Sequence, residues 1–207
     1  MKIKLSAAGK RFNREWIFRN ANLEFNSQTS YAITGPNGSG KSTLLQCLGG
    51  MFQLSEGQIQ YAIGNGQLEN EEVYKQISFC APYMEVIEEM TLIEFLKFHQ
   101  QFKPFITDFT IEKIIAAIGL QAAANKQIRF YSSGMKQRVK LAQAIFSDVE
   151  IILLDEPCSN LDANGIELYH SLIKNYCLQR LVIVCSNDEV EYNFCKEIIA
   201  IQNFRNF

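Results

Sequence analysis

The chain has 207 residues, of which 47% are hydrophobic and 20% are charged, the composition of an ordinary folded globular protein. This length allows one substantial core with a smaller lobe packed on it. The net charge of −2 gives no reason to expect a nucleic-acid groove or a broad basic membrane patch, so we expect no nucleic-acid partner.

The apolar segments are short. The first residues lack the apolar stretch of a signal peptide, and residues 151–154 are far fewer than the roughly 20 needed to span a membrane. We therefore expect a soluble, cytoplasmic protein. The six cysteines form no CxxC pair and mostly lie in apolar runs. A zinc or redox site is the alternative, but the pattern favours small buried hydrophobes in a reducing compartment.

Apolar runs rich in β-branched residues recur along the chain. They predict strands that are buried on both faces, as in a largely parallel sheet. These runs lie at residues 31–34, 77–80, 151–154, 181–185 and 198–201. Antiparallel edge strands are predicted instead at residues 3–5, 16–25 and 58–63, with a turn at 64–66.

Helical patterns separate these strands. One helix is expected to begin just after Lys41, and a second at Thr91, where Thr91 and Glu94 have the spacing of a capping box. Further helices are predicted at residues 111–118, after Ser132 and at 166–176. The sequence therefore predicts a single α/β domain, residues 1–207. Its core would cover about 1–81 and 146–207, and a helical lobe would be inserted at about 82–145.

A glycine-rich segment follows the first predicted buried strand and precedes a helix. Such a loop turns successive backbone amides towards an anion, and the helix N-terminus adds partial positive charge. Lys41 would reach the β- and γ-phosphates of ATP, and the Ser42 hydroxyl would bind Mg²⁺. A chance match is the alternative, which the strand and helix on either side disfavour. The candidate nucleotide-binding residues are Gly35, Pro36, Asn37, Gly38, Ser39, Gly40, Lys41, Ser42 and Thr43.

Two carboxylates end the predicted strand at 151–154. Asp155 is placed to hold Mg²⁺, directly or through water, and Glu156 is placed to polarise the attacking water. A strand that ends in a solvated acidic turn is the alternative. The phosphate-binding pattern upstream favours the functional interpretation, with Lys41 and Glu156 as catalytic residues.

The order of three motifs is similar to that of a known family. Residues 131–138, Tyr-Ser-Ser-Gly-Met-Lys-Gln-Arg, resemble the ABC signature, and Ser-Asn-Leu-Asp at 159–162 resembles the D-loop. Together with Gly-Pro-Asn-Gly-Ser-Gly-Lys-Ser-Thr at 35–43, they identify the chain as a member of the ABC transporter ATP-binding family, over about residues 1–190. The resemblance implies a P-loop NTPase core with a largely parallel sheet, an antiparallel β edge and an inserted helical lobe.

The resemblance also implies partners and further site residues. ATP would close two copies of the chain head to tail, so that Ser132, Ser133 and Gly134 of one copy meet the γ-phosphate held by the other. For Ser132, a simple helix N-cap is the alternative. The family stacks adenine on an aromatic residue, and Phe12 occupies that position, with Trp16 and Phe18 as competitors.

Two residues expected from the family are missing. Pro82 stands where a glutamine normally contacts Mg²⁺ and water, and Gln76 lies at the wrong end of its strand to substitute. Asn187, the third candidate catalytic residue, stands where a histidine normally contacts the γ-phosphate. An amide donates a neutral hydrogen bond but carries no charge and shuttles no proton. We therefore expect slow turnover. We do not expect a dead site, because Lys41, Asp155 and Glu156 are all present.

The leading hypothesis is an ATP-hydrolysing subunit that drives integral-membrane transporter subunits from the inner face of the cell membrane. Met84, Val86 and Ile87 either contact that partner or cover the lobe's own core. The signature wording is more similar to exporters than to importers. A nucleotide-gated module with little hydrolysis remains the alternative, as does, more remotely, a soluble ABC protein of DNA repair or translation.

Overall fold

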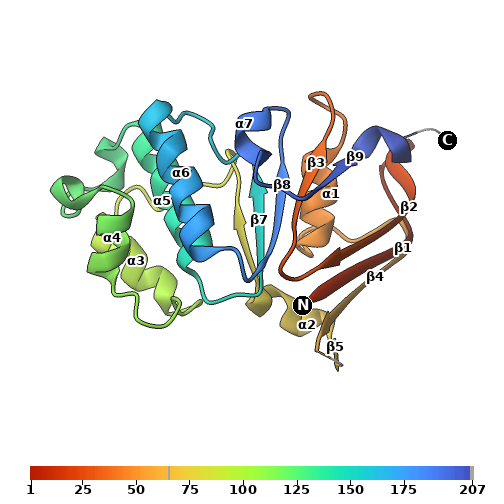
Figure 1. The fold of residues 1–207 in the computed structure, drawn as a ribbon, viewed down its shortest axis with the longest axis horizontal. Helices are drawn as coiled ribbons and strands as arrows, with labels where there is room; N and C mark the ends of the chain where they lie inside the picture. Colours follow the sequence, from red (N-terminus) through yellow and green to blue (C-terminus); the bar gives the residue numbers. More distant parts are fainter. Residues whose placement is uncertain (65, 206–207) are drawn as a thin grey trace.

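The structure is a computed structural model that describes residues 1–64 and 66–205. Two β-sheets stand side by side, and most of the helices pack on the far side of the parallel one (Figure 1). The predicted turn at 64–66 includes Asn65, which lies outside the described residues. No helix in the described part of the chain is long and apolar enough to cross a membrane.

The parallel sheet has the strand order β6-β7-β8-β3-β9. Its strands are β3 (Ser30–Thr34), β6 (Ile77–Cys80), β7 (Ile151–Asp155), β8 (Leu181–Cys185) and β9 (Glu197–Ala200). Every neighbouring pair is parallel, so the carboxyl ends of β3, β6, β7 and β8 share one edge. The loops that follow these four strands are therefore brought together, as at the ligand-binding edge of open α/β sheets.

The antiparallel sheet has the order β2-β1-β4-β5. Its strands are β1 (Lys2–Phe12), β2 (Glu15–Asn26), β4 (Glu56–Ile63) and β5 (Gly66–Leu68). The helices are α1 (Lys41–Leu48), α2 (Asn70–Val73), α3 (Leu92–Gln100), α4 (Ile111–Ala117), α5 (Ser133–Phe146), α6 (Ala163–Tyr176) and α7 (Glu189–Tyr192). The capping box predicted at Thr91 is present at the start of α3, where the Thr91 hydroxyl accepts from Glu94 N and the Glu94 carboxylate accepts from Thr91 N.

The core divides at the parallel sheet, because successive residues of a strand face opposite sides. Ile152 and Leu154 of β7 belong to a cluster with α3, α4, α5 and α6. Ile151 and Leu153 belong to a second cluster with α1 and the antiparallel sheet. The helical side thus shares a continuous core with one face of the sheet. This arrangement confirms the predicted fold class, whereas the domain boundaries remain a prediction.

One predicted strand is wrong in its detail. The run at 198–201 was expected to be a buried strand, but β9 is one of the two edge strands of the sheet, and the Ile198 side chain is 64% exposed. Ile201 is fully buried and lies in the 3-10 turn that follows (Ile201–Phe204). An apolar run has the same sequence signature in a central strand and in a strand that is paired on one side only.

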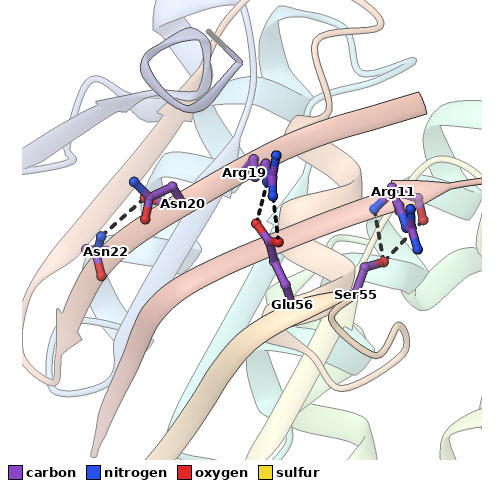
Figure 2. A network of polar contacts seen from close by, with 6 residues as sticks. All are labelled: Arg11, Arg19, Asn20, Asn22, Ser55 and Glu56. Carbon is purple, nitrogen blue, oxygen red and sulfur yellow. Dashed lines mark hydrogen bonds and ion pairs between the residues drawn. The ribbon is translucent and has the colours of Figure 1, made fainter. Parts of the chain in front are cut away.

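Polar contacts tie β1 and β2 to β4 (Figure 2). Arg19 donates from Nε and Nη2 to the two carboxylate oxygens of Glu56, at 2.7 and 3.2 Å, passing over β1 at Gly9. A Cβ on Gly9 would lie 2.8 Å from Glu56 Cγ, so a glycine there leaves room for the pair. Arg11 N also donates to Ser55 Oγ at 3.1 Å. These contacts hold the β1–β2 hairpin, which carries Phe12 at its tip.

Candidate functional site

The phosphate loop, residues 35–43, connects β3 to α1. Gly35, Gly38 and Gly40 have φ values of 147°, 74° and 99°, a region that side chains rarely adopt. A Cβ on Gly40 would also lie 2.4 Å from Ile17 Cγ2 of β2. Glycine at this position therefore allows both the turn into α1 and the close approach of β2.

Lys41 is the first residue of α1, and its side chain crosses the loop. The residue is 5% exposed, and its ammonium donates to the carbonyl oxygens of Gly35 at 2.7 Å and Pro36 at 3.3 Å. These carbonyls hold the positive charge over the concave side of the loop. An ammonium in this place can move to a phosphate without a change in the helix.

Three buried polar atoms near the loop have no hydrogen-bond partner among the described residues. They are Ser39 Oγ and both carboxylate oxygens of Asp155, in residues that are 1% and 2% exposed. Buried polar groups are normally paired, and an unpaired buried carboxylate is costly. Such atoms fit an absent ligand: Ser39 Oγ suits an anion, and the Asp155 oxygens suit a cation.

Asp155 is the last residue of β7. Burial raises the pKa of its carboxyl, the nearby Ser42 hydroxyl opposes that rise, and the charge of Glu156 adds to it. Mg²⁺ is typically bound by one or two carboxylates together with substrate phosphates. Ser42 and Asp155 have the donor set for such a site, because a hydroxyl and a carboxylate are both hard oxygen ligands.

Glu156 follows in a strained backbone conformation. Its φ is 42°, and its N–H donates to Cys185 O of β8 at 2.9 Å. A non-glycine residue in this region costs about 1–3 kcal/mol, and such strain clusters at functional sites. Glu156 lines a cavity of about 250 Å³ with the phosphate loop and Ile17. The structure therefore places Glu156 and Lys41 on one cavity.

The signature residues line a different cavity. Ser132, Ser133 and Gly134 surround a space of about 420 Å³ that has no lining residue in common with the phosphate-loop cavity. The Ser132 hydroxyl accepts from Met135 N at 3.2 Å, so the N-cap alternative is present in this structure. A Cβ on Gly134 would lie 2.9 Å from Asn160 O, which shows how closely the D-loop packs on the start of α5.

The comparisons with known proteins agree with this geometry. The pattern of the ABC transporter family matches residues 18–159. The chain belongs to the ABC transporter family. It is 32% identical over 170 residues to the uncharacterized ABC transporter ATP-binding protein YybJ of Bacillus subtilis, covering 79% of this chain and 75% of that protein.

Solved cassettes have the same fold. A dimeric ATP-binding cassette in a post-hydrolysis state, bound to ADP and phosphate, is 26% identical, with a TM-score of 0.81 over 96% of this chain and 93% of that one. An ATP-binding subunit of an ABC transporter is 18% identical, with a TM-score of 0.83 over 97% and 85%, which shows the fold alone. The family match and these cassettes identify the chain as an ABC ATP-binding subunit and an ABC-type ATPase.

Within this ABC cassette, the predicted adenine-stacking position is on the β1–β2 hairpin. Phe12 is 42% exposed and packs edge-on against Phe52, with centroids 5.5 Å apart and Lys10 Nζ over both rings. Phe18 is fully buried in the core, which excludes it as a competitor. Trp16 is partly buried, and the guanidinium groups of Arg11 and Arg19 lie over its ring.

Asn187 follows β8 and reaches the phosphate loop. Its Nδ2 donates to Asn37 Oδ1 at 2.6 Å, a contact between residues 150 positions apart. The sequence placed Asn187 at a γ-phosphate-sensing position but gave no sign of this partner. In this structure, Asn187 is therefore bonded to the phosphate loop itself.

The loop after β6 holds residues that sequence reasoning missed. The Pro82 carbonyl accepts from Lys140 Nζ at 2.8 Å, and the neighbouring Tyr83 hydroxyl accepts from Gln46 Nε2 of α1 at 2.5 Å. Burial raises the pKa of Tyr83 to about 12, opposed by the contact with Gln46, so the hydroxyl keeps its proton at neutral pH. The available signal was the position of Tyr83, directly after the proline that replaces the family's glutamine.

Three apolar residues of this loop, Met84, Val86 and Ile87, were predicted either to contact a membrane partner or to cover the lobe's own core, and they differ in their burial. Val86 is 8% exposed and belongs to the helical-side core, so the partner-contact interpretation is wrong for it. Ile87 is 37% exposed, and Met84 is partly buried against the other core cluster. Met84 also lines a cavity of about 440 Å³ with Met51, Tyr74 and Phe102, whose rim exposes large apolar side chains.

The cysteines are all free. Cys47, Cys80, Cys177 and Cys185 are buried, as expected for small hydrophobes, whereas Cys158 and Cys195 are partly buried. Burial raises the pKa of Cys47 to about 11 and that of Cys80 to about 12, which keeps both thiols protonated and unreactive.

Proposed function

We propose that this ABC-type ATPase binds MgATP at the phosphate loop and uses its hydrolysis to move a substrate through partner membrane subunits. The observation that carries the proposal is that a positive and a negative group, Lys41 and Asp155, lie at the same carboxyl edge of the parallel sheet. The buried Lys41 ammonium is bonded to carbonyls of the phosphate loop, and Asp155 has two buried carboxylate oxygens without a hydrogen-bond partner in the described residues. MgATP supplies the anion and the cation that these groups lack.

Each residue has a distinct role in this proposal. The loop amides and Lys41 bind the β- and γ-phosphates, while Ser42 and Asp155 hold Mg²⁺, which neutralises charge on the phosphates. Glu156 orients the attacking water and accepts its proton, and its turn in the backbone aims it at the cavity. Asn187 donates a neutral hydrogen bond to the γ-phosphate once it leaves Asn37.

A second copy of the chain completes the site. Ser132, Ser133 and Gly134 line a cavity separate from the phosphate loop of their own chain, so they are free to receive a nucleotide held by another copy. Hydroxyls and amides at the start of α5 form an anion site. ATP-dependent closure of two copies, head to tail, is the movement that would be passed to the membrane partner.

We place the protein at the inner face of the cell membrane, held there by integral-membrane partner subunits. Outward transport is the direction we propose, and it rests on the wording of the signature at residues 131–138. The apolar side chains exposed around Met51, Tyr74 and Phe102 are consistent with a protein partner.

A nucleotide-gated module with little hydrolysis is the second candidate. The replacement of the usual glutamine and histidine by Pro82 and Asn187 favours it, and the retention of Glu156 favours the ATPase. Steady-state phosphate release by the parent protein, compared with Glu156→Gln, separates the two. Equal rates would support the gated module.

Calorimetric titration with MgATP tests the proposed site through Lys41→Ala. We expect the variant to keep its fold and to lose at least about tenfold in affinity, because one charge-assisted contact of about 1.5–3 kcal/mol is removed. Lys113→Ala is the matched control, since Lys113 Nζ donates to the carbonyl of Asp108 in the helical lobe, outside the site. Unchanged MgATP affinity and normal hydrolysis in Lys41→Ala would refute the assignment.

A further inference from the structure

The loop after β6 has lost the side chain that the family uses near the metal. Pro82 has no side-chain donor, and its carbonyl is already held by Lys140. β6 pairs with β7 in parallel register, Cys80 opposite Leu154, so the residues just after Cys80 run alongside Asp155. A donor supplied by this loop to the metal site must therefore come from a residue close to Pro82.

Tyr83 meets that requirement through α1. Its hydroxyl accepts a hydrogen bond from Gln46 Nε2 at 2.5 Å. Ser42 and Gln46 are four residues apart on α1 and lie on the same face of the helix. Gln46 therefore holds the Tyr83 hydroxyl beside the helix face that carries the predicted metal ligand Ser42.

The proton of the Tyr83 hydroxyl is free to be donated to another group. A tyrosine hydroxyl both accepts and donates, and Gln46 uses only its accepting side. Both carboxylate oxygens of Asp155 are buried without a partner in the described part of the chain. Tyr83 follows the end of β6 and Asp155 ends the neighbouring strand β7, so both residues lie at the same carboxyl edge of the sheet.

We propose that Tyr83 is a positioning residue for the metal site, with its hydroxyl, held by Gln46, donating towards one oxygen of Asp155. The other oxygen is then turned to Mg²⁺ together with Ser42. Tyr83 thus supplies from position 83 a polar contact that the family places at position 82. The inference rests on the proposed function, since it assumes that MgATP binds at this site.

A purely structural role for Tyr83 predicts a different result. In that case, the bond to Gln46 only pins the β6 loop to α1, and its loss alters nucleotide binding to the same extent with and without metal. A positioning role instead alters the dependence on Mg²⁺ alone. The two roles are therefore separated by measuring ATP binding over a range of free Mg²⁺ and again in EDTA.

The test uses Tyr83→Phe, which removes one oxygen from a residue that is 52% exposed. We expect the Mg²⁺ concentration at half-maximal ATP affinity to rise about three- to tenfold, the effect of one hydrogen bond, while ATP affinity in EDTA stays unchanged. Gln46→Leu should shift the Mg²⁺ midpoint in the same direction by less, since the hydroxyl remains but is no longer held. Tyr176→Phe, at a tyrosine that packs against Phe109 and Phe146 at the end of α6, should show the Mg²⁺ midpoint of the parent.

Two results would overturn the inference. One is a Tyr83→Phe variant with the Mg²⁺ midpoint of the parent, and the other is an equal loss of ATP affinity in Mg²⁺ and in EDTA. A parent that binds no ATP would refute the proposed function, and this inference with it. A parent that binds MgATP beside an unaffected Tyr83→Phe refutes the inference alone.

Discussion

Replacing Glu156 by glutamine should separate nucleotide binding from hydrolysis. Glutamine has nearly the same shape, so the turn at φ 42° and the bond from residue 156 N to Cys185 O are expected to persist. The carboxylate on the phosphate-loop cavity is lost, and with it the general base. A positioned base contributes roughly 10²–10⁴-fold to the rate, which corresponds to about 3–5 kcal/mol of activation free energy.

Binding should survive this substitution or improve. The charge of Glu156 helps to raise the pKa of Asp155, so its removal lets Asp155 stay ionised to lower pH and hold Mg²⁺ more readily. MgATP should then accumulate between two copies of the chain, because hydrolysis no longer releases it.

Two assays test the prediction. Phosphate release should fall at least about 100-fold in Glu156→Gln, and size-exclusion chromatography with MgATP should show a dimer. Glu150→Gln is the matched control, since Glu150 lies just before the opposite end of β7 and is exposed. Hydrolysis within tenfold of the parent would refute the role of Glu156 as base. A variant that stays monomeric at high protein concentration would contradict the composite site.

Further substitutions test Asn187, the phosphate loop and the helical lobe. Asn187→His should raise kcat by up to about tenfold, or about 1.4 kcal/mol, with little change in KM, because a charged donor stabilises the separating phosphate better; a rate equal to the parent's contradicts this. Gly40→Ala should weaken MgATP binding and lower the melting temperature, since its Cβ would lie 2.4 Å from a side-chain methyl of β2. Gly50→Ala is the control: Gly50 also has a positive φ, but its Cβ would meet nothing within 4 Å, so the substitution should cost only backbone strain. Burial lowers the pKa of His99 to about 4, so the unfolded chain binds the proton first and stability should fall as pH drops from about 6.5 to 4. His99→Gln should flatten that fall in melting temperature, while His170→Gln should keep it.

The sequence predicted helices and strands well where the hydrophobic pattern extended over enough residues to be recognised. β7 and β8 match their predicted apolar runs to within one residue, and α3 begins directly after the capping Thr91. β5, α2 and α7 were missed, because three or four residues carry no readable period. β9 was placed correctly along the chain, but its exposure was not predicted, since pairing on one side only is decided by the fold.

In the site, too, the features formed by contiguous residues could be predicted from the sequence, whereas contacts between distant segments could not. The phosphate loop, Asp155 and Glu156 are found from sequence because strand, turn and helix are contiguous there. The bonds from Asn187 to Asn37 and from Gln46 to Tyr83 join segments that meet only at the common edge of the parallel sheet. The burial of Phe18 was also hidden, because irregular pairing between β1 and β2 near Lys10 breaks the simple alternation along the hairpin.

Both positions at which the chain differs from the family lie at or beside a residue that contacts the phosphate loop or α1, the helix that follows it. Asn187 is bonded to the phosphate loop, and Tyr83, beside Pro82, is bonded to the helix that the loop starts. Each of these contacts is made by a neutral amide or phenol, which binds about half as strongly as a charged partner. Neither change removes Lys41 or the loop amides, which hold the nucleotide in our proposal. The departures should therefore lower the rate of hydrolysis far more than the affinity for MgATP, so a slow cassette with ordinary nucleotide affinity is the outcome that the arrangement of these residues favours.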